Sequence, residues 1–171
     1  MNPKPARESF TTTTIEVLPN DTNTLNTLFG GRLIEWMDIT AGISAQRHTG
    51  LVVVTAAINH VSFDIPIRLA DIVTIEAMVT RTFRTSVETH VEAWVENRKT
   101  GERKRCNEAY FTFVAVDDSG RPLEILPVVA ETQVEKKRYD GALRRRQLSL
   151  ILAGRMKPED AAELKALFEK D

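Results

Sequence analysis

The 171-residue sequence contains a single cysteine, Cys106. One thiol cannot form a disulfide within the chain and cannot build a cysteine metal cluster, so a reducing compartment is expected. The sequence also lacks the run of ~18 or more apolar residues that a spanning helix needs, and its first residues lack the apolar segment of a secretory signal. We therefore expect a soluble cytoplasmic protein that does not cross a membrane.

Neither sign of charge predominates, because the sequence has 23 Lys and Arg residues and 24 Asp and Glu residues, which gives a net charge of -1. No global field attracts nucleic acid or an acidic membrane, so neither is an expected partner. A local basic pocket for a phosphorylated ligand is compatible with this balance.

Several catalytic motifs are missing, including the G-x-S-x-G elbow, H-E-x-x-H, the P-loop and paired C-x-x-C. The three histidines, His48, His60 and His90, are scattered and adjoin no obvious partner in the sequence. We interpret them as structural. No metal and no organic cofactor is expected.

Five segments with strand character accompany one long helical segment. Period-two alternation and short turns favour an antiparallel sheet with one face inward. Strands are expected at 10–18, 52–63, 71–80, 86–96 and 107–116, and a helix at 28–48. The helical segment is apolar nearly all round, which is typical of a helix buried nearly all round.

The order of these segments predicts an α+β protein with the hotdog fold, in which a curved antiparallel sheet wraps around one long central helix. The predicted organisation has a flexible lead-in over 1–9, the hotdog domain over 10–130 and a charged, helical extension over 131–171. Pro158, followed by acids, is typical of a helix start in this extension.

Asp38 is unusual because it interrupts the apolar helical segment. Burying an unpaired carboxylate costs several kcal/mol, so the side chain should be paired, protonated or functional. One interpretation is a structural Asp that binds a loop amide. The other is a general base or nucleophile.

Gly30 and Gly31 open the same helical segment. They could permit a tight turn, or they could let a carbonyl oxygen approach the free N–H groups of the helix N-terminus. Asn23, in the preceding loop, is compatible with an Asx turn or with a side-chain amide that holds the same carbonyl or a water.

A distance links these residues to dimerisation. Asp38 lies eight residues beyond Gly30, about 12 Å along a helix axis. One helix cannot bring both to a single reacting carbon, whereas two antiparallel copies can. If Asn23, Gly30 and Asp38 form one site, that site lies at a homodimer interface.

The chain resembles the hotdog acyl-CoA thioesterases, within them the brain-type acyl-CoA hydrolases and their small bacterial relatives. The resemblance extends from about residue 14 to residue 127, and its most specific part is the pattern D-x-N-x(6)-GG-x(5)-MD. Supporting segments are VVVTAAINHVSF, RTSVETHVEAWV and NEAYFTFVAVDDSGRP.

The resemblance implies hydrolysis of acyl-CoA to CoA and a free fatty acid. It places the catalytic Asp on Asp38, the active-site Asn on Asn23 and the amide that polarises the carbonyl on Gly30. It also implies homodimers that assemble as trimers of dimers. The step Arg84-Thr85-Ser86, with Gly31, resembles the surface for the substrate's CoA part, although a solvated turn explains Arg84-Thr85-Ser86 equally well.

Two other functions fit the same fold. A non-hydrolytic acyl-CoA-binding or regulatory protein would have no need of a desolvated carboxylate at Asp38. A hotdog hydratase would need a His–acid pair, and only His48, at its far end, lies in the central helical segment.

Overall fold

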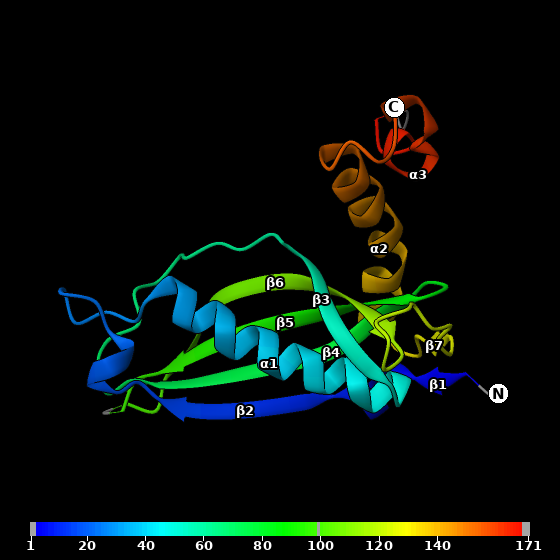
Figure 1. Cartoon of the computed structure of the whole chain (residues 1–171). Coiled ribbons are helices and arrows are strands. Elements are labelled where there is room, and N and C mark those ends of the chain that lie inside the picture. Colours follow the sequence, from blue (N-terminus) through cyan, green and yellow to red (C-terminus); the bar gives the residue numbers. More distant parts are fainter. Residues whose placement is uncertain (1–2, 99, 169–171) are drawn as a thin grey trace. The chain divides into compact units, whose positions relative to one another are not determined.

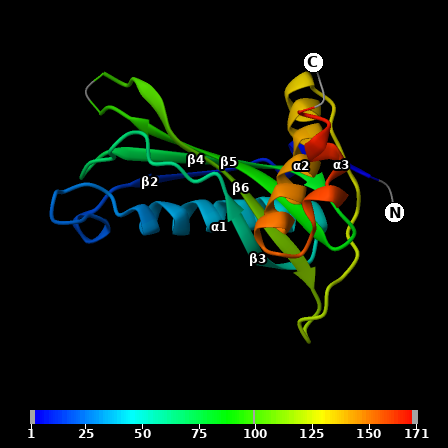
Figure 2. The same ribbon diagram turned by 90° about the horizontal axis from the view of Figure 1, so that it is seen from above.

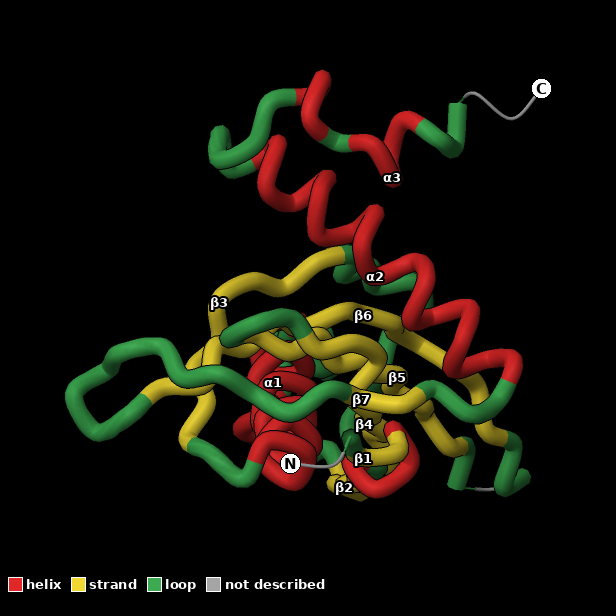
Figure 3. The backbone as a smooth tube through the Cα atoms, turned by 90° about the vertical axis from the view of Figure 1, so that its right-hand side faces the viewer, coloured by secondary structure: helices red, strands yellow, loops and turns green. Residues whose placement is uncertain are grey.

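A five-stranded antiparallel sheet curves around one long helix (Figures 1 and 3). The computed structural model describes residues 3–98 and 100–168. The sheet has the order β2-β4-β5-β6-β3, so β2 and β3 are its edges. Its strands are β2 (Thr11–Glu16), β3 (Val52–Asn59), β4 (Ile72–Thr82), β5 (Ser86–Glu96) and β6 (Arg103–Val116), and the helix is α1 (Gly30–Thr49). This arrangement confirms the predicted α+β hotdog fold.

Two strand ends differ from the prediction. β3 ends at Asn59, because His60 has a φ of 61° and turns the chain out of the extended conformation. β6 begins at Arg103, because Asn97 and Gly101 close a tight turn with a hydrogen bond between their backbones. Charged residues at the start of β6 therefore belong to the strand and not to the turn.

The described part of the expected flexible lead-in is packed against the sheet, which corrects that expectation. β1 (Lys4–Pro5) pairs in parallel with β7 (Val128–Val129). The next turn, Ala6–Ser9, buries both of its end residues, and the hydroxyl of Ser9 accepts a hydrogen bond from the amide of Val79 in β4. Small residues at Ala6 and Ser9 permit this close packing.

Helix α1 lies along the concave side of the sheet, as the view from above also shows (Figure 2). Its buried side chains follow helical spacing and form one face, made of Leu33, Met37, Thr40, Ala41, Ser44, Ala45 and His48. The expectation of a helix buried nearly all round is wrong for the single chain. Ile39 and Ile43 are exposed, because one sheet covers only one face of the helix.

The chain divides into two compact units, Met1–Val129 and Ala130–Asp171. The second contains α2 (Gln133–Leu152) and the short α3 (Ala162–Lys165). Thr132 and Glu135 cap α2 reciprocally, each side chain accepting a hydrogen bond from the other residue's amide. Pro158 begins a single 3-10 turn ahead of α3 rather than a long helix. Within the described residues, no helix is both long and apolar enough to cross a membrane.

Candidate active site

Asp38 is half-buried on α1, and its partner is a threonine of the edge strand β3. The hydroxyl of Thr55 donates a hydrogen bond of 2.8 Å to Oδ1 of Asp38. A bulge in β3 between Thr55 and Ala57 interrupts the pairing with β6 at this point. Bulges of this kind re-aim a side chain next to an active site. The carboxylate is therefore positioned by a hydroxyl, and no Lys or Arg of residues 3–98 and 100–168 forms an ion pair with it.

An apolar surface surrounds the Asp38–Thr55 pair. Its members are Ile39 and Ile43 on α1 and Ile58 on the edge strand β3, all of them exposed. An exposed edge strand with apolar side chains is a template for pairing with another chain. The pair thus lies inside a surface that has the character of an interface.

The N-terminus of α1 lies at the other end of the helix from this pair. The first intrahelical bond of α1 runs from the amide of Leu33 to the carbonyl of Phe29, so the amides of Gly30 and Gly31 have no intrahelical acceptor. A Cβ on Gly30 would lie 2.9 Å from Cζ of Phe63, whereas a Cβ on Gly31 would meet nothing within 4 Å. A side chain at position 30 would therefore require the exposed Phe63 ring to move.

Asn23 forms an Asx-type loop with Thr27. Its side-chain oxygen accepts hydrogen bonds from the amides of Leu25 and Thr27, at 2.9 and 3.2 Å. Its Nδ2 lies 2.9 Å from the hydroxyl of Thr27. Asn23 therefore forms an Asx turn in this loop, as one of the two interpretations predicted. Because Thr27 lines the cavity beside Gly30, the loop also places Asn23 next to that cavity.

A cavity of about 360 Å³ opens beside Gly30. Apolar side chains dominate its lining, which consists of Thr27, Leu28, Gly30, Leu33, Phe63, Ile65, Pro66, Ile67 and Cys106. Burial raises the pKa of the Cys106 thiol to about 11, so the thiol is neutral at physiological pH. The cavity suits an uncharged, apolar group bound close to the helix N-terminus.

The predicted substrate-binding step Arg84-Thr85-Ser86 lies far from Gly30 within one chain. Ser86 is opposite Val114 of β6, which is opposite Val54 of β3, so this step shares the Thr55 end of the sheet. Arg84 extends into solvent, 3.6 Å from Glu124. Ser86 itself is buried. In the single chain Arg84-Thr85-Ser86 shares only the end of the sheet with Thr55, because the Ser86 side chain points to the face opposite α1, whereas Asn23 lies near Gly30.

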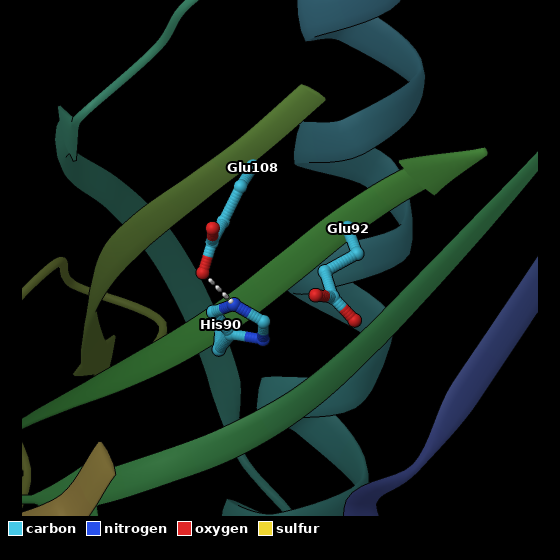
Figure 4. Close-up of side chains that lie close together, drawn as sticks. All are labelled: His90, Glu92 and Glu108. Atoms are coloured by element: carbon cyan, nitrogen blue, oxygen red, sulfur yellow. Dashed lines mark hydrogen bonds and ion pairs between the residues drawn. The ribbon is translucent and has the colours of Figure 1, made fainter. Parts of the chain in front are cut away.

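A polar cluster that the sequence did not reveal lies on the sheet face opposite α1. Nε2 of His90 is 2.7 Å from Oε1 of Glu108, and a ligand atom of Glu92 lies within 4.8 Å of both (Figure 4). Arg105 bonds Glu92 at 3.0 Å and Glu108 at 3.3 Å, and these contacts hold the pKa of Arg105 above its usual value. These residue types can ligate a metal, but Arg105 already supplies positive charge to both carboxylates.

The His90–Glu108 pair bears on the hydratase alternative, which needs a His–acid pair. Successive residues of β5 point to opposite faces, and Val91 lies in the core beneath α1, so His90 points away from the helix. The pair is therefore separated from Asp38 and Gly30 by the sheet. No signal in one sequence could reveal it, because Glu108 becomes a neighbour of His90 only through strand pairing.

Comparison with known proteins shows the family of this chain. The profile of the Thioesterase superfamily matches residues 25–102. The uncharacterized acyl-CoA thioester hydrolase YkhA of Bacillus subtilis is 40% identical over 139 residues, which are 81% of each chain. The chain belongs to the acyl-CoA thioester hydrolases of the thioesterase superfamily. It also matches mouse acetyl-coenzyme A thioesterase at 34% identity, where the match covers 78% of this chain and 24% of the mouse protein.

Solved thioesterases share the fold of this family member over most of its length. A hexameric acyl-CoA thioesterase superposes with a TM-score of 0.85 at 38% identity, covering 90% of this chain and 98% of that one. The Staphylococcus aureus acyl-CoA hydrolase, solved with butyryl coenzyme A and coenzyme A, has a TM-score of 0.82 at 35% identity, covering 90% and 95%. That hydrolase was also solved with alanine in place of an Asn, an Asp and a Thr.

Proposed function

We propose that this thioesterase hydrolyses acyl-CoA at composite sites, each made by two chains of a homodimer. One observation carries the residue assignment. The Asn, the Asp and the Thr replaced in the S. aureus hydrolase are separated by 15 and 17 residues. Asn23, Asp38 and Thr55 have the same separations, and in this chain the last two are hydrogen-bonded.

The two groups of residues complement one another. Asn23 and Gly30 lie at the N-terminus of α1, whereas Asp38 and the Arg84-Thr85-Ser86 step lie at the Thr55 end of the sheet. Two copies with antiparallel α1 helices would bring one group from each chain together. The apolar surface around Asp38 would then be buried in the interface.

The chemistry follows from the roles of these groups. The thioester carbonyl accepts a hydrogen bond from the Gly30 amide, with Asn23 nearby, so negative charge on its oxygen is stabilised. Asp38 of the partner subunit takes a proton from water, whose oxygen bonds the carbonyl carbon as the C–S bond breaks. The CoA thiolate then leaves and takes up a proton. Direct attack by Asp38, followed by hydrolysis of the anhydride, gives the same products.

In this proposal the Arg84-Thr85-Ser86 step and Gly31 contact the CoA part of the substrate. Neither route requires a metal or an organic cofactor, because the thiolate is a good leaving group. We also propose a cytoplasmic location, which suits a chain with one cysteine, and a trimer of dimers, which the hexameric relative supports.

Release of thiol from a series of acyl-CoAs tests the proposal. Wild-type protein should release CoA, and Asp38→Asn should abolish turnover while the protein stays folded. Asp118→Asn is the matched control, because Asp118 is an exposed aspartate in the turn that follows β6. Wild-type turnover in Asp38→Asn would overturn the assignment. Binding of acyl-CoA without hydrolysis of any thioester by the wild-type protein would favour the non-hydrolytic binding protein, and hydration of an enoyl-CoA would favour the hydratase.

A further inference from the structure

The ring of Phe63 covers the N-terminus of α1. Its Cζ and Cε1 atoms lie 2.9 and 3.0 Å from the position that a Cβ on Gly30 would occupy. The side chain is nevertheless 57% exposed, although it lines the cavity beside Gly30. A ring that touches a glycine on one side and solvent on the other stands at the mouth of the cavity, not in its floor.

The backbone next to Phe63 is held, whereas its ring is not. Asn107 of β6 is almost fully buried, and its side-chain amide donates a hydrogen bond to the carbonyl of Ser62. The left-handed conformation of His60 directs the chain from β3 toward this anchor. The described contacts thus position the loop while leaving the ring free to change rotamer about a fixed backbone.

The cavity behind the ring has room for a limited apolar chain. A methylene group is comparable in size to a water molecule, whose share of liquid volume is ~30 Å³, so 360 Å³ holds at most about a dozen heavy atoms. Leu33, Ile65 and Ile67 contribute aliphatic walls. No Asp, Glu, Lys or Arg side chain is among the described residues that line it. These walls disfavour polar or charged acyl groups.

We propose that Phe63 is the specificity-determining residue of this site. Its ring closes the cavity over Gly30, turns aside when the thioester carbonyl reaches the Gly30 amide, and then forms one wall around the acyl chain. The substrate class is straight-chain, unsubstituted acyl-CoA of short to medium length. This inference rests on the proposed acyl-CoA hydrolase function and deepens it.

The kinetic profile over straight-chain acyl-CoAs tests the role of Phe63. In the wild type, kcat/KM should rise about fourfold for each methylene that enters the cavity, and should stop rising at about twelve carbons. Phe63→Leu removes the wall and should change the ratio of kcat/KM between long and short substrates at least about tenfold. Phe168→Leu is the matched control, since Phe168 is exposed in the second compact unit, and it should leave the ratio unchanged.

Ile65→Val provides a second variant that removes only one methylene from the cavity wall. It should move the longest well-accepted acyl group up by about one carbon. An unchanged profile in both folded variants would overturn the role of Phe63 and of the cavity while leaving the hydrolase function standing. Absence of turnover by the wild type with every acyl-CoA would overturn both, so the two failures are distinguishable.

Discussion

Thr55 Oγ1 lies 2.8 Å from Asp38 Oδ1 and donates a hydrogen bond to it, joining the edge strand β3 to the exposed side of α1. The donor occupies one lone pair of the carboxylate and fixes its rotamer. The second oxygen has no hydrogen bond to another described residue. A carboxylate oriented in this way can receive a proton from water or attack a carbonyl carbon on its open side.

Thr55→Val should lower kcat without a comparable rise in KM, because Thr55 positions Asp38 and is not assigned a contact with substrate. Hydrogen bonds to charged groups contribute about 1.5–3 kcal/mol, so we expect a loss of roughly 10- to 150-fold. Thr55→Ser should restore most of the activity. Thr14→Val, on the opposite edge strand, is the control. Equal activities in Thr55→Val and wild type would contradict this positioning role.

Mixed dimers should reveal the composite site. Asn23→Ala and Asp38→Asn proteins should each be inactive, whereas a dimer with one chain of each kind retains one intact site. Random exchange makes about half of the dimers mixed, so activity should recover to about a quarter of the wild-type value. Differently tagged chains can verify the exchange. No recovery despite verified exchange would mean that Asn23 and Asp38 act in the same chain.

The helix and the strands could be predicted because their local patterns are strong. The helix predicted at 28–48 is Gly30–Thr49, and it stops where Gly50 adopts a φ of 68°. The strand predicted at 86–96 matches β5 throughout. Alternation of apolar and polar residues specifies which face of a strand is buried, so these elements needed no tertiary information.

The contacts that give the candidate site its geometry could not be predicted. Alternation does not say that β3 lies at an edge, and so it does not bring Thr55 to Asp38. Gly30 was predicted as a possible carbonyl site, yet the ring that lies against it belongs to Phe63, on a loop 33 residues later. Contacts between distant segments depend on the whole packing arrangement and leave no mark in the local sequence.

Gly30→Ala should destabilise the protein only slightly, because the new Cβ would lie 2.9 Å from Cζ of the Phe63 ring and that exposed ring can turn aside. The cost should be smaller than the about 1–3 kcal/mol of overpacking in a core, measured as the free energy of unfolding in urea. In a Phe63→Leu background the same change should cost less, since the ring is gone. Gly31→Ala should be neutral or slightly stabilising, because nothing lies within 4 Å of its Cβ position. Equal effects at both glycines would contradict the packing explanation.

Cys106 should be unreactive in the native protein. Its side chain is 1% exposed, and burial raises its pKa to about 11, so very little thiolate is present at pH 8. A coloured thiol reagent at pH 8 should label less than about a tenth of the protein in an hour without denaturant, and all of it in guanidinium. Rapid labelling of the native protein would show that the cavity wall opens. Slow labelling also makes thiol release a clean assay for CoA.

His48 should make the fold sensitive to acid. Desolvation by burial lowers its pKa from the usual 6.5, and its Nε2 donates to the carbonyl of Leu126 at 3.1 Å. The unfolded chain therefore binds a proton at His48 near pH 6.5, whereas the native state binds it only at lower pH. The stability of the fold is thus fully present above pH 6.5 and falls as the pH drops below that value. His48→Gln should flatten the fall in melting temperature between pH 7.5 and pH 5. His60→Asn, at an exposed histidine, should keep the wild-type slope. A slope unchanged by His48→Gln would assign the acid sensitivity to other groups.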